Sequence, residues 1–359
     1  MPTALDKLFM AESMTTAVRR FADQSKDRSW IAPYEAGEQL QPTGDTVQWD
    51  EMRYSRDLAP VTGQSSPSTS TKPVDVIKKF APIVAIKQHV DLDARFMLMA
   101  KGFGAEMPNP AEILATNLEN LTNKTLRTLN FWAAQSFLAS GGSVDLSTIP
   151  NSLLTGVTLV YPIQSISSTG QWSDPALAIR SGEINALKRT YQRASGMRAA
   201  RAVASDVVEG YITGNNQVNN LVAGGGLAGR MLETSFEDGG GVVNFGGLGW
   251  QFARDYYAAD ATPDTAVDVI TDTDLVAILP DPSLYRQCFA MALGEAVVPS
   301  GPISALVAGN PLNLLTRQRG FCAWVELITN PIGLRLHVEW HGMLIQKVRN
   351  AVGRYNTTP

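Results

Sequence analysis

Residues 46–90 read TVQWDEMRYSRDLAPVTGQSSPSTSTKPVDVIKKFAPIVAIKQHV. Two segments that carry the apolar residues of strands, 46–56 and 74–90, flank a tract rich in Ser, Thr and Pro at 57–73. The pattern predicts a long two-stranded hairpin. The tract has too few apolar side chains to offset its ordering entropy, and an isolated hairpin is only marginally stable in water. We therefore expect the hairpin to lie against another copy of the chain.

The composition is that of a globular protein. The chain has 359 residues, of which 44% are hydrophobic and 18% charged, and its net charge is -4. A chain with this net charge lacks the excess of positive charge that tight, sequence-independent binding of DNA requires. No apolar run approaches the ~18 residues that cross a bilayer, and the first residues lack the pattern of a secretory signal. The two cysteines, Cys288 and Cys322, are expected to be free thiols in a reducing cytoplasm.

The first 45 residues have the pattern of an arm rather than of a domain. Periodic apolar residues predict a helix over 3–24, with Thr3 as its N-cap. An extended stretch with Pro and Gly follows it. Trp30 and Tyr34 favour a packed arm over a flexible tail, because large aromatic side chains are costly to leave in water.

A very long helix is predicted over 109–140. Asn109 and Pro110 form an N-cap and an N1 proline, and Gly141 marks the end. Apolar residues recur between them at steps of three and four, as in Leu114, Leu118, Leu121, Leu129 and Trp132. Such a helix is about 45 Å long, enough to span a domain.

Two repeated units follow the long helix. A helix is predicted over 176–195, with Gly196 just past its end. A strand at 199–204 then leads into a helix from Ser205 to Ile212. The same order of strand, turn and helix is predicted over 275–293, with its helix at 284–293. Two such units indicate a mixed sheet flanked by helices.

Loops and strands complete the pattern. The Gly- and Asn-rich segment 214–247 is predicted to form long loops, and a strand is predicted over 248–256. Segments 321–329 and 334–345 form a predicted hairpin, whose second strand alternates apolar and polar residues. Its apolar face carries Leu334, Leu336, Val338 and Trp340, and its polar face carries Arg335, His337, Glu339 and His341.

Few patterns point to chemistry. His337, Glu339 and His341 project from one face of a predicted strand, and two imidazoles with a carboxylate can bind zinc. A solvated or interface strand face explains the same residues with fewer assumptions. Residues 224–229 match the letters GxGxxG without the strand and helix that a dinucleotide site needs. The sequence has no P-loop, no GxSxG and no paired cysteines. We therefore predict no catalytic residue, no cofactor and no metal ligand.

The order of these elements resembles the major capsid proteins of tailed phages, most closely the lambda-like branch. The motifs that carry the resemblance are TVQWDE at 46–51, NPAEILATNLENL from Asn109, WSDP at 172–175, SDVVEGYITGN from Ser205 and LPDPS at 279–283. It implies an α+β fold of the Hong Kong 97 type. The implied parts are an N-terminal arm at 1–45, an E-loop hairpin with its return at 46–108, a peripheral domain at 109–171 with a spine helix at 109–140, an axial mixed α/β domain at 172–320, and C-terminal strands at 321–359 that close the sheet between the two domains.

The resemblance implies a structural protein without enzymatic activity. It would assemble into hexamers and pentamers of an icosahedral phage head that encloses double-stranded DNA without reading its sequence. The implied location is the virion, after assembly in the bacterial cytoplasm and away from membranes, with scaffold, portal and decoration proteins as further partners. Two other hypotheses are an encapsulin-like compartment and a metal-dependent hydrolase that uses His337, Glu339 and His341. The expected inter-subunit contacts are Trp30, Trp49, Tyr54, Pro60, Pro67, Lys78, Phe80, Asn215 and Asn216.

Overall fold

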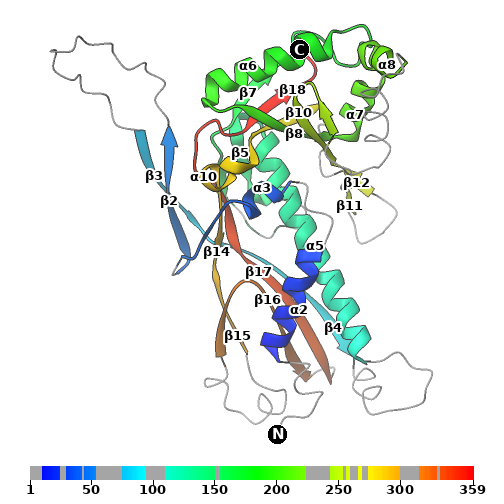
Figure 1. Cartoon of the computed structure of the whole chain (residues 1–359). Helices are drawn as coiled ribbons and strands as arrows, with labels where there is room; N and C mark the ends of the chain where they lie inside the picture. The colour runs from blue at the N-terminus through cyan, green and yellow to red at the C-terminus, as the bar shows by residue number, and fades with distance from the viewer. Residues whose placement is uncertain are drawn as a thin grey trace, which may run out of the picture.

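Two larger sheets and one long helix organise the chain, as Figure 1 shows. The structure is a computed structural model. It describes residues 10–24, 30–42, 44–53, 75–93, 110–149, 152, 154, 156–223, 243–253, 256–258, 266–268, 274–299, 315–329 and 332–359. Tyr54, Pro60, Pro67 and the glycine segment 224–229 lie outside the described residues. Among the described helices, none combines the length and the apolar character needed to span a membrane.

The first sheet is built on the C-terminal hairpin. Its strands are β1 (Glu38–Leu40), β4 (Val84–Asp93), β14 (Phe289–Leu293), β15 (Glu295–Pro299), β16 (Leu315–Thr329) and β17 (Ile332–Gln346). β16 and β17 pair along their length from Gly320↔His341 to Thr329↔Ile332. The predicted hairpin is confirmed, and its predicted apolar face is buried, with Leu334, Leu336, Val338 and Trp340 at most 1% exposed.

Two helices cover the apolar face of this sheet. Met14 and Val18 of α2 (Ala11–Gln24) pack with Leu118 of α5 (Pro110–Leu138) and with Leu336. Thr15 also closes part of the free edge of β16, because its hydroxyl accepts the backbone N–H of Ala323 at 3.0 Å. A strand edge left unpaired would invite association with other chains. The predicted helix 3–24 is confirmed from residue 11 onward, and residues 1–9 lie outside the described part.

The second sheet has the strand order β7-β18-β13-β8-β10-β9 and lies at the other end of α5 (Figure 1). Its strands are β7 (Gln164–Ser167), β8 (Ala199–Ser205), β9 (Val243–Phe245), β10 (Leu248–Ala253), β13 (Leu275–Pro280) and β18 (Gly353–Asn356). The helices of this part are α6 (Ile184–Ser195), α7 (Asp206–Thr213) and α8 (Asn216–Ala223). Trp172, Tyr191, Trp250 and Tyr355 share one buried core there.

The helix predicted over 176–195 is confirmed in its second half. Residues Ile179–Glu183 form a π-helical turn before α6 begins, and Gly196 ends the helix in the left-handed conformation with φ 75. The predicted strand at 199–204 and helix from 206 are confirmed as β8 and α7. Short elements complete the described chain: α3 (Ala32–Glu35), β5 (Ser143–Asp145), β6 (Thr158–Val160), β11 (Tyr256–Ala258) and β12 (Ala266–Asp268).

The helix predicted over 284–293 is wrong. Only α10 (Tyr285–Cys288) is helical, and the apolar run that follows it is strand β14. A short apolar run does not distinguish a buried helix from a strand with two buried faces. β14 and β15 therefore belong to the first sheet although they fall inside the expected axial range 172–320, whereas β7 and β18 belong to the second sheet.

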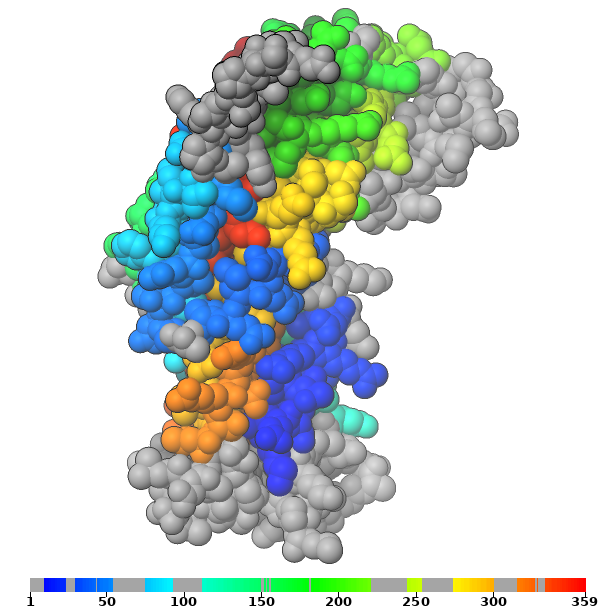
Figure 2. Space-filling view, turned by 60° about the vertical axis from the view of Figure 1, so that its left-hand side comes forward, coloured from blue at the N-terminus to red at the C-terminus, as the bar shows by residue number. Residues whose placement is uncertain are grey.

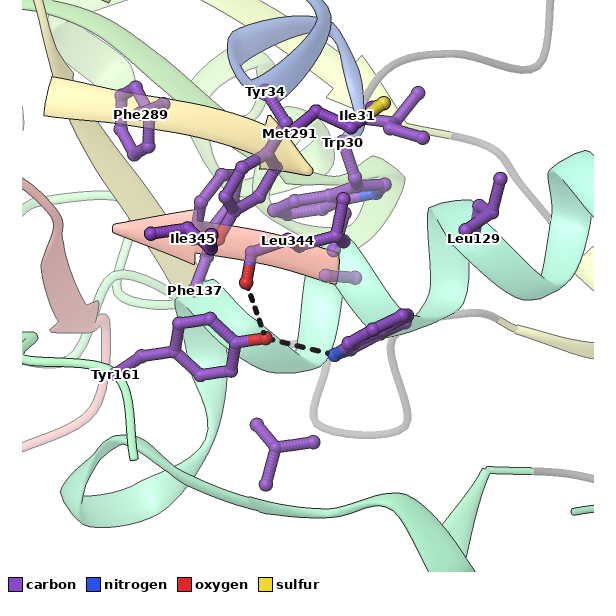
Figure 3. Packing of buried hydrophobic residues seen from close by; sticks show 14 of the residues in the cluster. Trp30, Ile31, Tyr34, Leu129, Phe137, Tyr161, Phe289, Met291, Leu344 and Ile345 are labelled. Carbon is purple, nitrogen blue, oxygen red and sulfur yellow. Dashed lines mark hydrogen bonds between the residues drawn. The ribbon is translucent and has the colours of Figure 1, made fainter. Parts of the chain in front are cut away.

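The long helix α5 joins the two parts, and the predicted spine helix is confirmed. It has 29 residues, and the arm packs across it. The side-chain Oδ1 of Asn130 accepts the backbone N–H of Trp30 at 2.9 Å, and Tyr34 stacks on Phe137 with ring centroids 5.3 Å apart. Figure 3 shows this core, in which Tyr161 donates its hydroxyl proton to the carbonyl of Leu344 at 3.2 Å. The packed arm is thus confirmed from residue 30 onward.

The predicted N-terminal hairpin is shorter than expected. β2 (Thr46–Arg53) and β3 (Asp75–Pro82) form a separate two-stranded sheet, which projects from the side of the body in Figure 1. The single strand predicted over 74–90 is wrong, because β3 ends at Pro82 and β4 enters the first sheet. Pro82 has no N–H to continue the ladder. The N–H of Ile83 instead bonds to the carbonyl of Asp45 at 2.8 Å.

Candidate functional site

The outward face of the β2–β3 hairpin exposes large apolar side chains. Phe80 is 78% exposed and Val76 is 49% exposed. Alternate strand residues share a face, so Lys78 lies between them, and the register places Gln48, Asp50 and Met52 opposite the three. We call these six residues the hairpin outer face, of which Met52 is half-buried and packs in part against the subunit's own core. Figure 2 shows the two strands, in blue and cyan, at the left-hand surface of the molecule.

The opposite face of the hairpin packs on the subunit's own core. Val47 is 2% exposed, Ala81 is 4% exposed, and Trp49 packs against the same core. The indole N–H of Trp49 is buried and has no hydrogen-bond partner among the described residues. Apolar contacts therefore hold this ring in position. Glu51 is also largely buried, and Lys79 lies 3.7 Å from its carboxylate. Most of this side of the hairpin is therefore covered within the subunit, although Ile77 on the same face is 46% exposed.

The tip-side end of the described β2–β3 ladder is fixed to the C-terminal part of the chain. The N–H of Met52 donates to the carbonyl of Lys347 at 2.7 Å, and the N–H of Arg349 donates to the carbonyl of Met52 at 3.0 Å. The ammonium group of Lys347 in turn lies 2.6 Å from the carboxylate of Glu38. These contacts hold β2 in place, so the hairpin outer face has a defined direction.

The structure separates the expected inter-subunit contacts into three groups. Lys78 and Phe80 share the hairpin outer face, and Asn216 is exposed on α8. Trp30 and Asn215 are 0% exposed and have no surface to offer a neighbour, so the structure assigns both to the interior of the subunit. Trp49 points inward. Tyr54, Pro60 and Pro67 lie outside the described residues.

Asn215 caps helix α8 instead of facing solvent. Its Oδ1 accepts the N–H of Gln217 at 3.0 Å, and its Nδ2 donates to the carbonyls of Pro175 at 3.1 Å and Leu177 at 2.9 Å. The amide thereby ties the start of α8 to the turn that precedes the π-helical segment. These partners lie far away in the sequence, which is why the sequence did not predict this role.

Replacing Asn215 by alanine is expected to lower the free energy of unfolding by about 1–2 kcal/mol, because the cap is lost and the carbonyls of Pro175 and Leu177 each lose one of two donors. The neighbouring Asn216→Ala is the matched control, and since this side chain is exposed we expect a change within about 0.5 kcal/mol. Urea denaturation of both variants measures the difference. Equal stability of the two variants would contradict the interior role of Asn215.

The polar face of β17 does not assemble the three residues of the hydrolase hypothesis. His337 bonds to Glu326 at 3.0 Å and stacks on Trp324 with centroids 4.8 Å apart. His341 instead bonds to Glu339 at 2.7 Å. The structure thus brings His341 and Glu339 together and directs His337 to a different carboxylate.

Cys322 joins His341 and Glu339, and the sequence did not predict it. The sulfur, one carboxylate oxygen and one imidazole nitrogen lie within 4.8 Å of one another. Cys322 is the cross-strand partner of Glu339, because the hairpin register runs back from Thr329↔Ile332. The sequence placed the turn at 330–333, which shifts that register. Counting from the correct strand ends would have revealed the pair.

The thiol of Cys322 is protonated at neutral pH. Burial raises its pKa to about 12, and the nearby charge of Glu339 acts in the same direction. The thiolate is the nucleophilic form of cysteine, so this side chain is a poor nucleophile as it stands. The geometry and the charge therefore give no support to covalent catalysis at this cluster.

Comparisons with known proteins find similarity at the level of structure. No family model matches the sequence, and no curated protein matches it. A candidate capsid protein of an E. coli prophage has a TM-score of 0.58 at 10% identity, with 97% of this chain and 98% of that chain covered. A phage-related protein from Bordetella bronchiseptica has a TM-score of 0.55 at 11% identity, with 97% of each chain covered. A structure from Gordonia phage Cozz has a TM-score of 0.50 at 13% identity and covers 93% of this chain and 87% of that one.

These likenesses establish the fold. The chain has the α+β capsid fold of the Hong Kong 97 type that the sequence predicts, and the match extends over nearly its whole length. The lambda-like branch stays a prediction.

Proposed function

We propose that the chain is the major capsid protein of a tailed phage and that it assembles into the hexamers and pentamers of an icosahedral head. The observation that carries the proposal is the hairpin outer face, with Phe80 78% exposed on a hairpin whose strand β2 is fixed to the C-terminal part of the chain. The likeness in fold to a candidate capsid protein of a prophage supports it. Val76, Ile77 and Phe80 of β3 are all exposed, and a group of exposed apolar side chains is typical of a surface that a partner covers.

The energetics favour a second copy of the chain as that partner. Full burial of a side chain such as Phe80 contributes about 1.5–3 kcal/mol, and obligate interfaces exceed about 2,000 Å². In a closed shell every subunit gives its hairpin to one neighbour and receives another, so a modest contact is repeated over the whole surface. In this proposal the E-loop, residues 46–108, lies over the neighbouring subunit, and the axial domain surrounds the capsomer axis.

The proposed content of the shell is double-stranded DNA, held without sequence-specific contacts. A net charge of -4 on the whole chain gives no general attraction to phosphates. Scaffold, portal and decoration proteins are the further partners of such a head, which forms in the host cytoplasm and persists in the virion. An encapsulin-like compartment would hold protein instead. Particles purified from the producing cells and analysed for nucleic acid and protein cargo separate the two functions.

Sedimentation and negative-stain microscopy of the purified full-length chain test the proposal. We expect polyhedra, tubes or capsomers, because the hairpin outer face becomes buried only on association. A monomer that persists at high concentration, with a scaffold protein supplied, would contradict the function.

Deletion of residues 57–73 tests the hairpin tip separately. These residues carry too few apolar side chains to form a core of their own, so we expect soluble and folded subunits that assemble poorly. Circular dichroism checks the fold, and sedimentation velocity checks the assembly. Particles formed in normal yield by the deletion variant would show that the tip has no part in assembly.

A further inference from the structure

The polar face of the first sheet carries a compact set of three different ligand types. Glu339 and His341 are two residues apart on β17 and therefore point to the same side, and Cys322 faces Glu339 from β16. Their ligand atoms lie within 4.8 Å of one another. We call these three residues the Cys–Glu–His cluster.

Burial makes this cluster unlike an ordinary solvated strand face. Cys322 is 0% exposed and Glu339 is 5% exposed. The carboxylate of Glu339 is held by His341 at 2.7 Å and by the ammonium group of Lys87 at 3.5 Å. The sulfur of Cys322 makes only a long contact of 3.7 Å to the backbone carbonyl of Glu339. The buried sulfur thus retains its capacity as a ligand.

The donor set and its charge suit Zn²⁺. Zinc in proteins takes thiolate sulfur, imidazole nitrogen and carboxylate oxygen. On binding, the thiol of Cys322 gives up its proton to solvent. The resulting thiolate and the carboxylate offset the two positive charges of the ion, and a neutral imidazole adds none, so the complex carries no net charge. Neutrality matters because an uncompensated charge in a buried site is costly.

The strand positions paired with His341 carry small residues. The residues that face His341 are Gly320 on β16 and Ala85 on β4, which have no bulky side chain. Ligand atoms in a tetrahedral zinc site lie about 3.5 Å apart, so the widest separation in the cluster has to shrink by about 1 Å. Binding of an ion therefore requires a small adjustment of the three side chains.

We propose that Cys322, Glu339 and His341 bind one Zn²⁺ ion, with water as the fourth ligand. The ion links β16 to β17 and so stabilises the first sheet. Lys87 lies outside the coordination sphere, where its ammonium group neighbours the carboxylate of Glu339 and can hold it in place. This site is independent of the assembly proposed above, because its three ligands come from one subunit.

Zinc titration of the full-length chain tests the site. The purified protein is stripped with a chelator, titrated with Zn²⁺ alone and analysed for bound metal. We expect one ion for each chain. Cys322→Ser and His341→Ala should each weaken zinc binding by at least about tenfold, because each removes a direct ligand and even the loss of an outer partner costs 10–100-fold.

The chain provides a matched control for each variant. Cys288 is the other buried free thiol, and its sulfur contacts the sulfur of Met197 at 3.5 Å. His337 lies on the same strand as His341 but bonds to Glu326. Cys288→Ser and His337→Ala should therefore bind zinc as the parent does. Loss of zinc in His337→Ala with retention in Cys322→Ser would overturn the proposal and assign the ion to the residues of the hydrolase hypothesis.

Cobalt binding shows thiolate coordination without replacement of any of the three proposed ligands. Co²⁺ bound by a thiolate gives a charge-transfer absorption in the near ultraviolet, so the parent protein loaded with Co²⁺ should show this band. If Cys322→Ser fails to fold, the same band in Cys288→Ser decides, because Cys322 is then the one cysteine left in the chain. A parent protein that binds no stoichiometric zinc and shows no thiolate band overturns the site, and the cluster is then a hydrogen-bonded Glu–His pair beside a structural thiol.

Discussion

The double variant Val76→Asp and Phe80→Asp is expected to abolish assembly and to leave the subunit folded. Both side chains are exposed, at 49% and 78%, so the isolated subunit loses little. Each carboxylate would have to lose its water in the subunit contact, at a cost of several kcal/mol for each. Two such groups weaken one contact by at least about a thousandfold, at tenfold for each 1.4 kcal/mol. Sedimentation velocity measures assembly, and circular dichroism measures the fold.

The conservative variant Phe80→Leu is the control for this experiment. It keeps an apolar side chain at the same position, and we expect it to assemble at a slightly higher protein concentration. The central role of the hairpin outer face would be contradicted if the double aspartate variant formed particles in the same yield as the parent. It would also be contradicted if Phe80→Leu and the double variant were equally defective.

Phe137→Ala is expected to lower the free energy of unfolding by about 3–5 kcal/mol, the usual loss for a large aromatic residue in a core. Phe137 is 0% exposed and lies where the long helix, the arm and β14 meet. Its ring centroid is 5.3 Å from that of Tyr34 and 5.9 Å from that of Phe289. Removing it leaves a cavity between all three elements. Urea denaturation measures the loss.

Phe80→Ala makes the same chemical change at an exposed position and serves as the control. We expect its free energy of unfolding to stay within about 0.5 kcal/mol of the parent value. Limited proteolysis adds a local readout, since the arm at residues 30–35 should become more accessible in Phe137→Ala alone. Equal stability of the two alanine variants would mean that the arm does not pack on α5.

The elements that could be predicted from the sequence are those with local signals. α5 begins at Pro110, the proline that the sequence predicts at the first helical position, and keeps its apolar spacing to its end, so its limits follow from local residues. The alternation in β17 likewise identifies its buried face. β14 could not be predicted, because both of its faces are buried by distant segments and its apolar run has no period. The break at Pro82 also depends on a remote partner, the sheet that receives β4.

The candidate site could likewise be predicted only where the signal is local in the sequence. Phe80 and Lys78 could be placed on one hairpin face, because alternation along a strand is local. Trp30 and Asn215 were misassigned, since Asn130 and the carbonyls of Pro175 and Leu177 bury their polar groups from far along the chain. Cys322 was missed because its position beside Glu339 depends on the exact register of the C-terminal hairpin.

Electron cryo-microscopy of the assembled particle tests the central claim most directly, because it shows what lies against Phe80. In the isolated subunit this side chain is 78% exposed. We predict that in the particle it is buried against a neighbouring copy of the chain, together with Val76. Particles in which the hairpin outer face still points into solvent would contradict the account, whatever their shape.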